Sequence, residues 1–157
     1  MTPDGESIDI TSFDADIFAL TLAAENWSIH DKMSQVNTHP NDPNRYGIEV
    51  NDQDEQRGSN VRSKHIAVSA GKTYQLDFDA KQDSGSGIAV YLQFFDTQGK
   101  KLAISSEQAE ILMVIPPKAA DWKSYSLQAL APAGSKTLTV WLHSFNQNKV
   151  HAYFGNF

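Results

Sequence analysis

The chain has 157 residues and no cysteine, which excludes a disulfide framework, a thiolate nucleophile and a cysteine-ligated zinc site. Its formal net charge of -6 comes without a cluster of Lys and Arg to replace phosphate counterions, so nucleic acid is not an expected partner. No run approaches the ~20 apolar residues that a membrane span requires. This length allows one domain with a substantial core and is too short for two ordinary ones, so 1–157 is expected to be a single domain.

Alternating apolar and polar segments recur between turn signals, and no long segment keeps a 3.6-residue period, so the sequence predicts an all-β fold. Residues 16–24, rich in Ala and Leu, could instead form one short helix. Two polar segments, 38–44 and 51–60, are expected to be loops long enough to shape a binding site. The expected strands, in chain order, are 16–22, 27–32, 45–50, 64–68, 73–81, 88–95, 110–115, 123–130, 138–145 and 150–157.

Two of these strands carry aromatic and amide groups on the side that should face solvent. In 138–145 and in 88–95 the aliphatic residues alternate with polar or aromatic ones, so the aliphatic set faces the core. Such a composition on a solvated face is typical of a sugar-binding platform. The outward residues are Trp141 and His143 on one strand, and Tyr91, Gln93 and Phe95 on the other.

A third strand, 73–81, adds polar groups if it shares a sheet with these two. Its outward residues are Gln75, Asp77, Asp79 and Lys81. On one common surface, Trp141 and Tyr91 would stack on the apolar faces of pyranose rings, and the polar side chains would bind hydroxyl or carboxylate groups. A guanidinium suits a uronate carboxylate, and the residues beside the two loops that could extend the site in this way are Arg45, Tyr46, Arg57 and Arg62.

Each candidate also has a purely structural interpretation. Trp27 and Trp122 lie at junctions between loops and strands, where a core or edge anchor is more common than a sugar platform. His143 is more often a satisfied surface histidine than a ligand or base, and no second His stands at metal-ligand spacing from it. Asp77 and Asp79 could form a solvated acidic stripe.

Several phrases, in their order along the chain, resemble a known family. They are Ser63–Val68, Gly71–Lys81, Phe94–Gly99, Asp121-Trp122, Ala131-Pro132-Ala133-Gly134 and Tyr153-Phe154. The chain, from about Trp27 to Phe157, resembles the bacterial carbohydrate-binding modules of the galactose-binding-like jelly-roll superfamily. The resemblance implies a two-sheet antiparallel β-sandwich that binds polysaccharide or oligosaccharide on its concave sheet or at its loop rim. It also implies a module excised from a larger secreted or cell-surface enzyme, with a covalently linked glycoside hydrolase or polysaccharide lyase.

Members of this superfamily often hold a structural calcium ion between the amino-terminal segment and an Asp in the last strand. Here Gly155 or Asn156 stands where that Asp would be expected. Hard oxygen ligands for calcium would come from Asp14, Asp16, Glu25 and Asn156. Turn and cap acids on a solvated surface are the alternative interpretation.

The leading hypothesis is a noncatalytic carbohydrate-binding module. A glycosidase needs two carboxyl groups about 5 to 10 Å apart, and Asp77 with Asp79 fall near the bottom of that range. A small jelly-roll lyase would use Arg45, Tyr91 and His143, although the arginine-rich and Gln-Xaa-His strands expected of alginate lyases are absent. A structural or adhesion module that packs on a neighbouring domain is the remaining alternative.

Overall fold

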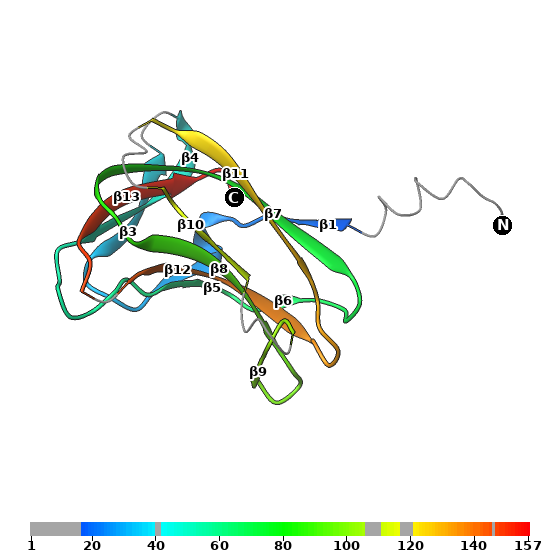
Figure 1. Ribbon diagram of the computed structural model, residues 1–157. Coiled ribbons are helices and arrows are strands. Elements are labelled where there is room, and N and C mark those ends of the chain that lie inside the picture. Colours follow the sequence, from blue (N-terminus) through cyan, green and yellow to red (C-terminus); the bar gives the residue numbers. More distant parts are fainter. Residues whose placement is uncertain (1–16, 40–41, 106–110, 117–120, 146) are drawn as a thin grey trace.

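The computed structural model describes residues 17–39, 42–105, 111–116, 121–145 and 147–157, and these fold as two β-sheets packed face to face. Figure 1 shows the sheets as two layers, with β4, β7, β11 and β13 in one and β5, β8 and β12 in the other. The helical content of the described residues is a single 3-10 turn, η1 (Ala24–Asn26). No helix in this part of the chain is long and apolar enough to cross a membrane. The all-β, jelly-roll sandwich predicted from the sequence is confirmed.

The first layer, sheet A, is built around the long strand β7. Its strand order is β1-β7-β13-β4-β3, with β11 on the other edge of β7, and β1 is the member that pairs in parallel. The strands of sheet A are β1 (Ile17–Leu20), β3 (Ser34–His39), β4 (Asp42–Asp52), β7 (Thr73–Gly85), β11 (Lys123–Leu130) and β13 (Val150–Gly155).

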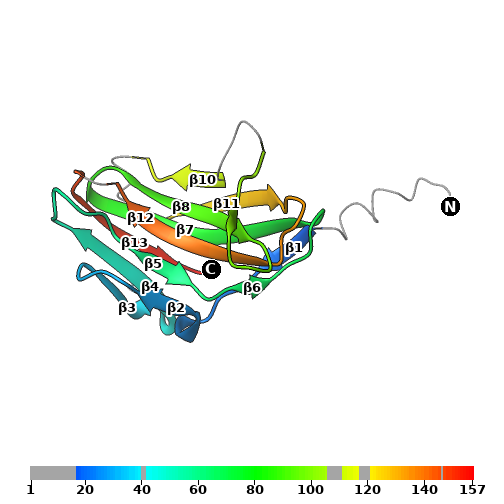
Figure 2. The same ribbon diagram turned by 90° about the horizontal axis from the view of Figure 1, so that it is seen from below.

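The second layer, sheet B, has the order β10-β8-β12-β5-β2, with short β9 beside β8 and short β6 beside β12. Figure 2, which views the molecule from below, shows β10 near one edge of this layer and β2 near the other. The strands of sheet B are β2 (Trp27–Ile29), β5 (Val61–Ser63), β6 (Ile66–Ala67), β8 (Ile88–Phe95), β9 (Lys101–Leu102), β10 (Ile111–Val114) and β12 (Thr137–Ser144).

The core lies between the sheets because the strands alternate in the way the sequence predicts. Phe78 on β7 and Phe154 on β13 come from sheet A, and Leu92 on β8 and Val140 on β12 meet them from sheet B, all at 0 or 1% exposure. Burial of these apolar faces stabilises the sandwich and leaves each sheet one outer surface. We call the outer surface of sheet A face A, and that of sheet B face B.

The strand predictions differ from the structure in instructive places. Each of the ten predicted strands has a counterpart, and β8 and β11 have the predicted bounds. The interpretation of 16–24 as a helix is wrong, because 17–20 form β1. The predicted loop 38–44 is wrong at both ends, because β3 continues to His39 and β4 begins at Asp42, with the two strands paired. β3 was missed because Val36 is its one aliphatic residue.

Candidate functional site

The sequence hypothesis placed three outward-facing sets of residues on one surface, and the structure separates them. β8 and β12 are neighbours in sheet B, with Trp141 paired to Tyr91. β7 lies in sheet A, so Gln75, Asp77, Asp79 and Lys81 lie on face A, opposite the aromatic pair. β7 and β8 are consecutive along the chain, but the turn that joins them crosses from one layer to the other. The prediction that the three sets share one surface is therefore wrong, although the residues predicted to face outward on each strand do so.

Face B holds a cluster of three rings. The ring centroids of Tyr91 and Trp141 are 4.9 Å apart, and those of Trp141 and His143 are 4.3 Å apart with an interplanar angle of 16°. Trp141 and His143 are half-buried, and Tyr91 is 8% exposed, so neighbouring side chains largely cover the tyrosine ring. The indole therefore offers the larger accessible ring of this aromatic platform, which we define as Tyr91, Trp141 and His143.

Groups from β5 and the preceding loop hold the platform in place. The Trp141 indole N–H donates to Asn60 Oδ1 at 2.8 Å, and the guanidinium of Arg62, its cross-strand partner, lies 4.8 Å from the indole centroid. His143 Nδ1 donates to the carbonyl of Ser59 at 2.7 Å, which fixes the tautomer of a neutral imidazole. A ring that is already held loses little side-chain entropy when a ligand stacks on it.

A shallow hollow of about 400 Å³ adjoins the platform. The Arg62 guanidinium donates to the Gln93 amide oxygen there, and Gln93 is 4% exposed. Thr139, the cross-strand partner of Gln93, is fully buried, and its hydroxyl has no hydrogen-bond partner among the described residues. The hollow is lined by Arg62, His65, Gln93, Phe95, Lys101 and Trp141.

The charged side chains at the outward strand positions of face B have one sign. Arg62 and Lys101 occupy outward strand positions there, and no Asp or Glu occupies such a position in the described strands of sheet B. These groups suit hydroxyls and carboxylates of a ligand, because guanidinium and ammonium groups only donate hydrogen bonds. Two carboxylates flanking a scissile bond, as a glycosidase needs, are not provided by these strands.

The loop 53–60 extends face B at one end. Together with the end of β2 it borders a second hollow of about 530 Å³, whose lining includes His30, Lys32, Arg57 and Asn60. Asp31 and Asp54 also line it, and the two carboxylate oxygens of Asp31 already accept four hydrogen bonds, from the backbone N–H of Met33, Ser34 and Asn60 and from the Ser34 hydroxyl. The prediction that 51–60 shapes a binding site stays a prediction, and Asn60 at the end of this loop contacts Trp141.

Face A receives the remaining predicted binding residues in a different setting. Gln75 Nε2 donates to Asp77 at 3.0 Å, and Asp79 accepts from the Ser124 hydroxyl at 2.7 Å and from Asn156. Asp77 and Asp79 thus take part in a hydrogen-bonded polar stripe along β7. Lys81 lies near the rings of Tyr153 and Trp122 and near the carboxylate of Asp83.

Arg45 and Tyr46 lie away from face B. Arg45, on β4 of sheet A, donates to Asn156 Oδ1. The Tyr46 hydroxyl donates to the Leu22 carbonyl and accepts from the Trp27 indole N–H, both at 2.8 Å. Burial raises the pKa of Tyr46 above 10.0, so the phenol keeps the proton that it donates. The prediction that this pair extends the Trp141 surface is wrong.

The predicted calcium donors are only partly described. Asp14 and Asp16 lie outside the described residues, Glu25 is exposed on η1, and Asn156 Oδ1 already accepts from Arg45. Two side-chain oxygens do not make a site for an ion that takes six to eight. No group of three or more His, Asp or Glu in the described part of the chain could hold a metal. Calcium binding remains a prediction that depends on the carboxylates of Asp14 and Asp16.

The other two tryptophans differ in their burial. Trp27 is 7% exposed and packs in the core, as predicted. Trp122 is half-buried at the start of β11 and stacks on His39, with centroids 4.6 Å apart. Sequence reasoning missed the contacts of Asn60, His65 and Lys101, which come from loops and very short strands. Of these three residues, Asn60 alone had a signal in the sequence, which is its position at the end of a polar loop.

The chain matches the model of the family described as "Carbohydrate binding domain" over residues 12–148. No curated protein matches it. Among solved structures, a Family 16 Carbohydrate Binding Module-2 is 14% identical, with TM-score 0.59 and coverage of 87% of this chain and 94% of that one. The enzymatically active domain of Bacteriophage CBA120 tailspike protein 4 is 19% identical, with TM-score 0.61 and coverage of 84% and 19%, so this chain spans about a fifth of its length.

A third structure contains two modules. The Clostridium thermocellum endo-1,4-beta-D-xylanase 10B CBM22-1-GH10 modules, complexed with xylohexaose, are 16% identical, with TM-score 0.54 and coverage of 85% of this chain and 26% of that one. At these identities the structural likeness shows the shared fold, whereas the family match covers most of the sequence. The chain therefore belongs to the carbohydrate-binding domain family.

Proposed function

We propose that the chain is a noncatalytic module that binds polysaccharide on face B and holds a covalently linked glycoside hydrolase or polysaccharide lyase near its substrate. The observation that carries the proposal is the aromatic platform beside Arg62 and Gln93, because a sugar ring has weakly apolar faces and a rim of hydroxyls. Such binding is modest, at about 10 μM to 1 mM, or roughly 4 to 7 kcal/mol.

Family membership and fold support this function. The xylanase with the same fold carries its carbohydrate-binding module and its catalytic module in one chain, and it was solved with xylohexaose. By analogy, we propose that 1–157 is one module of a larger secreted or cell-surface enzyme. The described strands of sheet B place no pair of carboxylates on face B, so this face fits binding better than glycoside hydrolysis.

A small polysaccharide lyase is the second candidate, because face B brings Arg62, Tyr91 and His143 together. A guanidinium could neutralise a uronate carboxylate, and a phenol and an imidazole could serve as base and acid. The Tyr91 and His143 ring centroids are 6.2 Å apart. Against this role, His143 donates to Ser59 and Tyr91 is largely covered.

Affinity electrophoresis over a panel of neutral and acidic polysaccharides, followed by a product assay on every polysaccharide that binds, tests the proposal. We expect retardation by at least one polysaccharide and release of neither reducing ends nor unsaturated uronate. Sustained product formation that disappears in Tyr91→Phe or His143→Ala would establish the lyase instead. Absence of retardation by the whole panel would favour a structural or adhesion module.

A further inference from the structure

Face A carries a row of side chains that crosses four strands and ends at Trp122, the residue before β11. The register pairs Lys81 on β7 with Tyr153 on β13, Tyr153 with Glu49 on β4, and Glu49 with Gln35 on β3. Trp122, at the start of β11, lies beyond Lys81 at the other end of the row. At about 4.8 Å between strands, the four paired positions span roughly 14 Å, which suits a short segment of an extended chain molecule.

The centre of the row is held in place by its own contacts. The Lys81 ammonium lies 4.9 Å from the Tyr153 ring centroid and 5.8 Å from that of Trp122. The Tyr153 hydroxyl donates to Glu49 Oε2 at 3.3 Å, and His151 Nε2 lies 2.7 Å from the same oxygen. The side chains of Lys81 and Glu49 are 23% and 24% exposed, so they are ordered by neighbours yet reachable from solvent.

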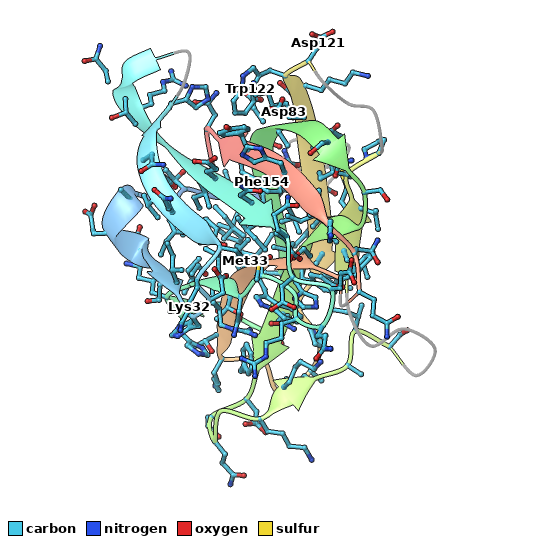
Figure 3. All side chains as sticks on the ribbon, turned by 90° about the vertical axis from the view of Figure 1, so that its left-hand side faces the viewer. Lys32, Met33, Asp83, Asp121, Trp122 and Phe154 are labelled. Carbon is cyan, nitrogen blue, oxygen red and sulfur yellow. The ribbon has the colours of Figure 1, made fainter. Side chains whose placement is uncertain are left out.

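A second contact set positions Trp122. Its ring stacks on His39 at an interplanar angle of 26°. His39 in turn lies against Gly155, where a Cβ atom would be 2.4 Å from His39 Cδ2. In Figure 3 Trp122 and Asp83 lie near each other, in agreement with the contact that each makes with Lys81. Trp122 thus rests on a histidine that needs a glycine beneath it.

The charges of this row determine which ligand it fits. Glu49 and Asp83 flank the single cation Lys81, and Asp83 lies 3.5 Å from it. Asp79 stands one outward position away on β7. A uronate or sulfate would meet these carboxylates, whereas sugar hydroxyls can donate to carboxylates and accept from an ammonium. Burial, and after it the Glu49 carboxylate, raises the pKa of Tyr153 above 10.0, so its hydroxyl keeps its proton.

We propose that the row Trp122, Lys81, Tyr153, Glu49 and Gln35 is a second glycan-binding surface, and that it takes an uncharged chain. The ring of Trp122 stacks on a pyranose face, and the ion pairs and amide bind the hydroxyl rim. Since faces A and B lie on opposite sides of the sandwich, two separate chain segments are bound at once. Within a polysaccharide network, such two-sided binding adds avidity without any new contact.

The three tryptophans provide the test, because Trp122 is on face A, Trp141 on face B and Trp27 in the core. Their indole N–H signals in ¹⁵N-labelled protein are assigned with Trp122→Phe and Trp141→Phe. The probes are xylohexaose, cellohexaose, mannohexaose, laminarihexaose and hexagalacturonate, each added to 10 mM. We expect at least one neutral hexaose to shift the Trp122 signal saturably, while hexagalacturonate leaves that signal and Trp27 stationary.

One substitution on face A identifies the surface. Tyr153→Ala should weaken the titration seen at Trp122 about fivefold, the size expected for one aromatic contact, and leave the titration at Trp141 unchanged. A Trp122 signal that is stationary with all four neutral hexaoses, or that follows Trp141 and is lost in Trp141→Phe, overturns the second surface. A Trp141 signal that is stationary with every probe overturns the proposed function of face B instead.

Discussion

The two faces of the sandwich support a tryptophan in the same way and surround it differently. On face B, Trp141 stacks on His143, and a Cβ atom on Gly58 would be 2.7 Å from His143 Cε1. On face A, Trp122 stacks on His39, which lies against Gly155. Each face therefore has an indole on an imidazole on a glycine, although Trp141 and His143 share strand β12 whereas Trp122, His39 and Gly155 come from three separate segments.

The difference lies in the polar groups beside each indole. Face B places Arg62 over Trp141, and the strand positions described there carry no outward carboxylate, whereas face A places Lys81 between rings with Glu49 and Asp83 nearby. Aromatic stacking provides affinity for any pyranose ring, and the charges select among rings. The comparison predicts that the two faces respond oppositely to acidic sugars.

The largest expected effect comes from filling the glycine beneath each histidine. A Cβ on Gly58 would lie 1.7 Å from the backbone oxygen of Ser144, which cannot move freely, whereas the three atoms nearest to a Cβ on Gly155 all belong to the His39 side chain. Overpacking typically costs about 1 to 3 kcal/mol, so we expect about 3 for Gly58→Ala and about 1 for Gly155→Ala. Urea unfolding of both variants measures this. Equal losses would contradict the proposed difference between the two supports.

Removal of the face B indole should have the next largest effect. Trp141→Ala is expected to weaken binding to a retained polysaccharide about tenfold, and to lower the free energy of unfolding by about 1 kcal/mol, because the ring is half-buried and stacked. Isothermal titration and thermal melting measure the two quantities. A variant that fails to fold would show that Trp141 is a core residue and not a platform.

The charge difference is tested with a matched pair of cations. Arg62→Met on face B should weaken binding of an acidic polysaccharide about fivefold and reduce its dependence on sodium chloride, because ion pairs near a surface are screened by salt. Lys81→Met on face A is the control and should change neither. The same loss in both variants would mean that acidic chains do not distinguish the faces.

Calcium should stabilise the chain without serving either face. If an ion is held by Asp14, Asp16, Glu25 and Asn156, chelation should lower the melting temperature by about 2 to 4 °C. A loss of about 1 kcal/mol in the free energy of unfolding has this effect in a domain of this size. Polysaccharide retardation should persist. An unchanged melting curve with added calcium and with chelator removes the ion from the account.

The smallest expected effect concerns the phenol of face A. Since burial and Glu49 raise the pKa of Tyr153 in the folded chain, the unfolded chain releases this proton first as pH rises. The free energy of unfolding should therefore fall above pH 10.0, the usual tyrosine pKa. Tyr153→Phe should show a shallower fall in urea titrations between pH 9 and 11. An identical slope in both proteins would contradict this environment for Tyr153.

Alternation of side chains predicted much of this structure and could not predict the rest. It placed Tyr91 and Trp141 on the outward sides of their strands, because a period of two assigns each residue to a side, and the structure pairs the two residues. It could not tell which sheet a strand joins, so Lys81 was grouped with Trp141 although the turn after β7 changes layer. Which of the two sheets a strand joins depends on the packing of the whole core, and the sequence of one strand does not contain that information.

The sequence also failed to predict elements that are short or polar. β5 is three residues long, with Arg62 between two buried residues, and nothing in so short a segment distinguishes a strand from a loop. Yet β5 and the loop before it bring Arg62 and Asn60 to the indole of Trp141. The platform was therefore predictable as a set of rings, whereas the polar groups that orient a sugar upon it were not.

A crystal structure of the chain with the oligosaccharide that it binds best would test the central claim most directly. We predict a sugar ring stacked on the indole of Trp141, with its hydroxyls within hydrogen-bond distance of Arg62 or Gln93. Additional sugar over Trp122 would be consistent with both surfaces. Sugar bound at any other place while the face of Trp141 stays empty would contradict the account.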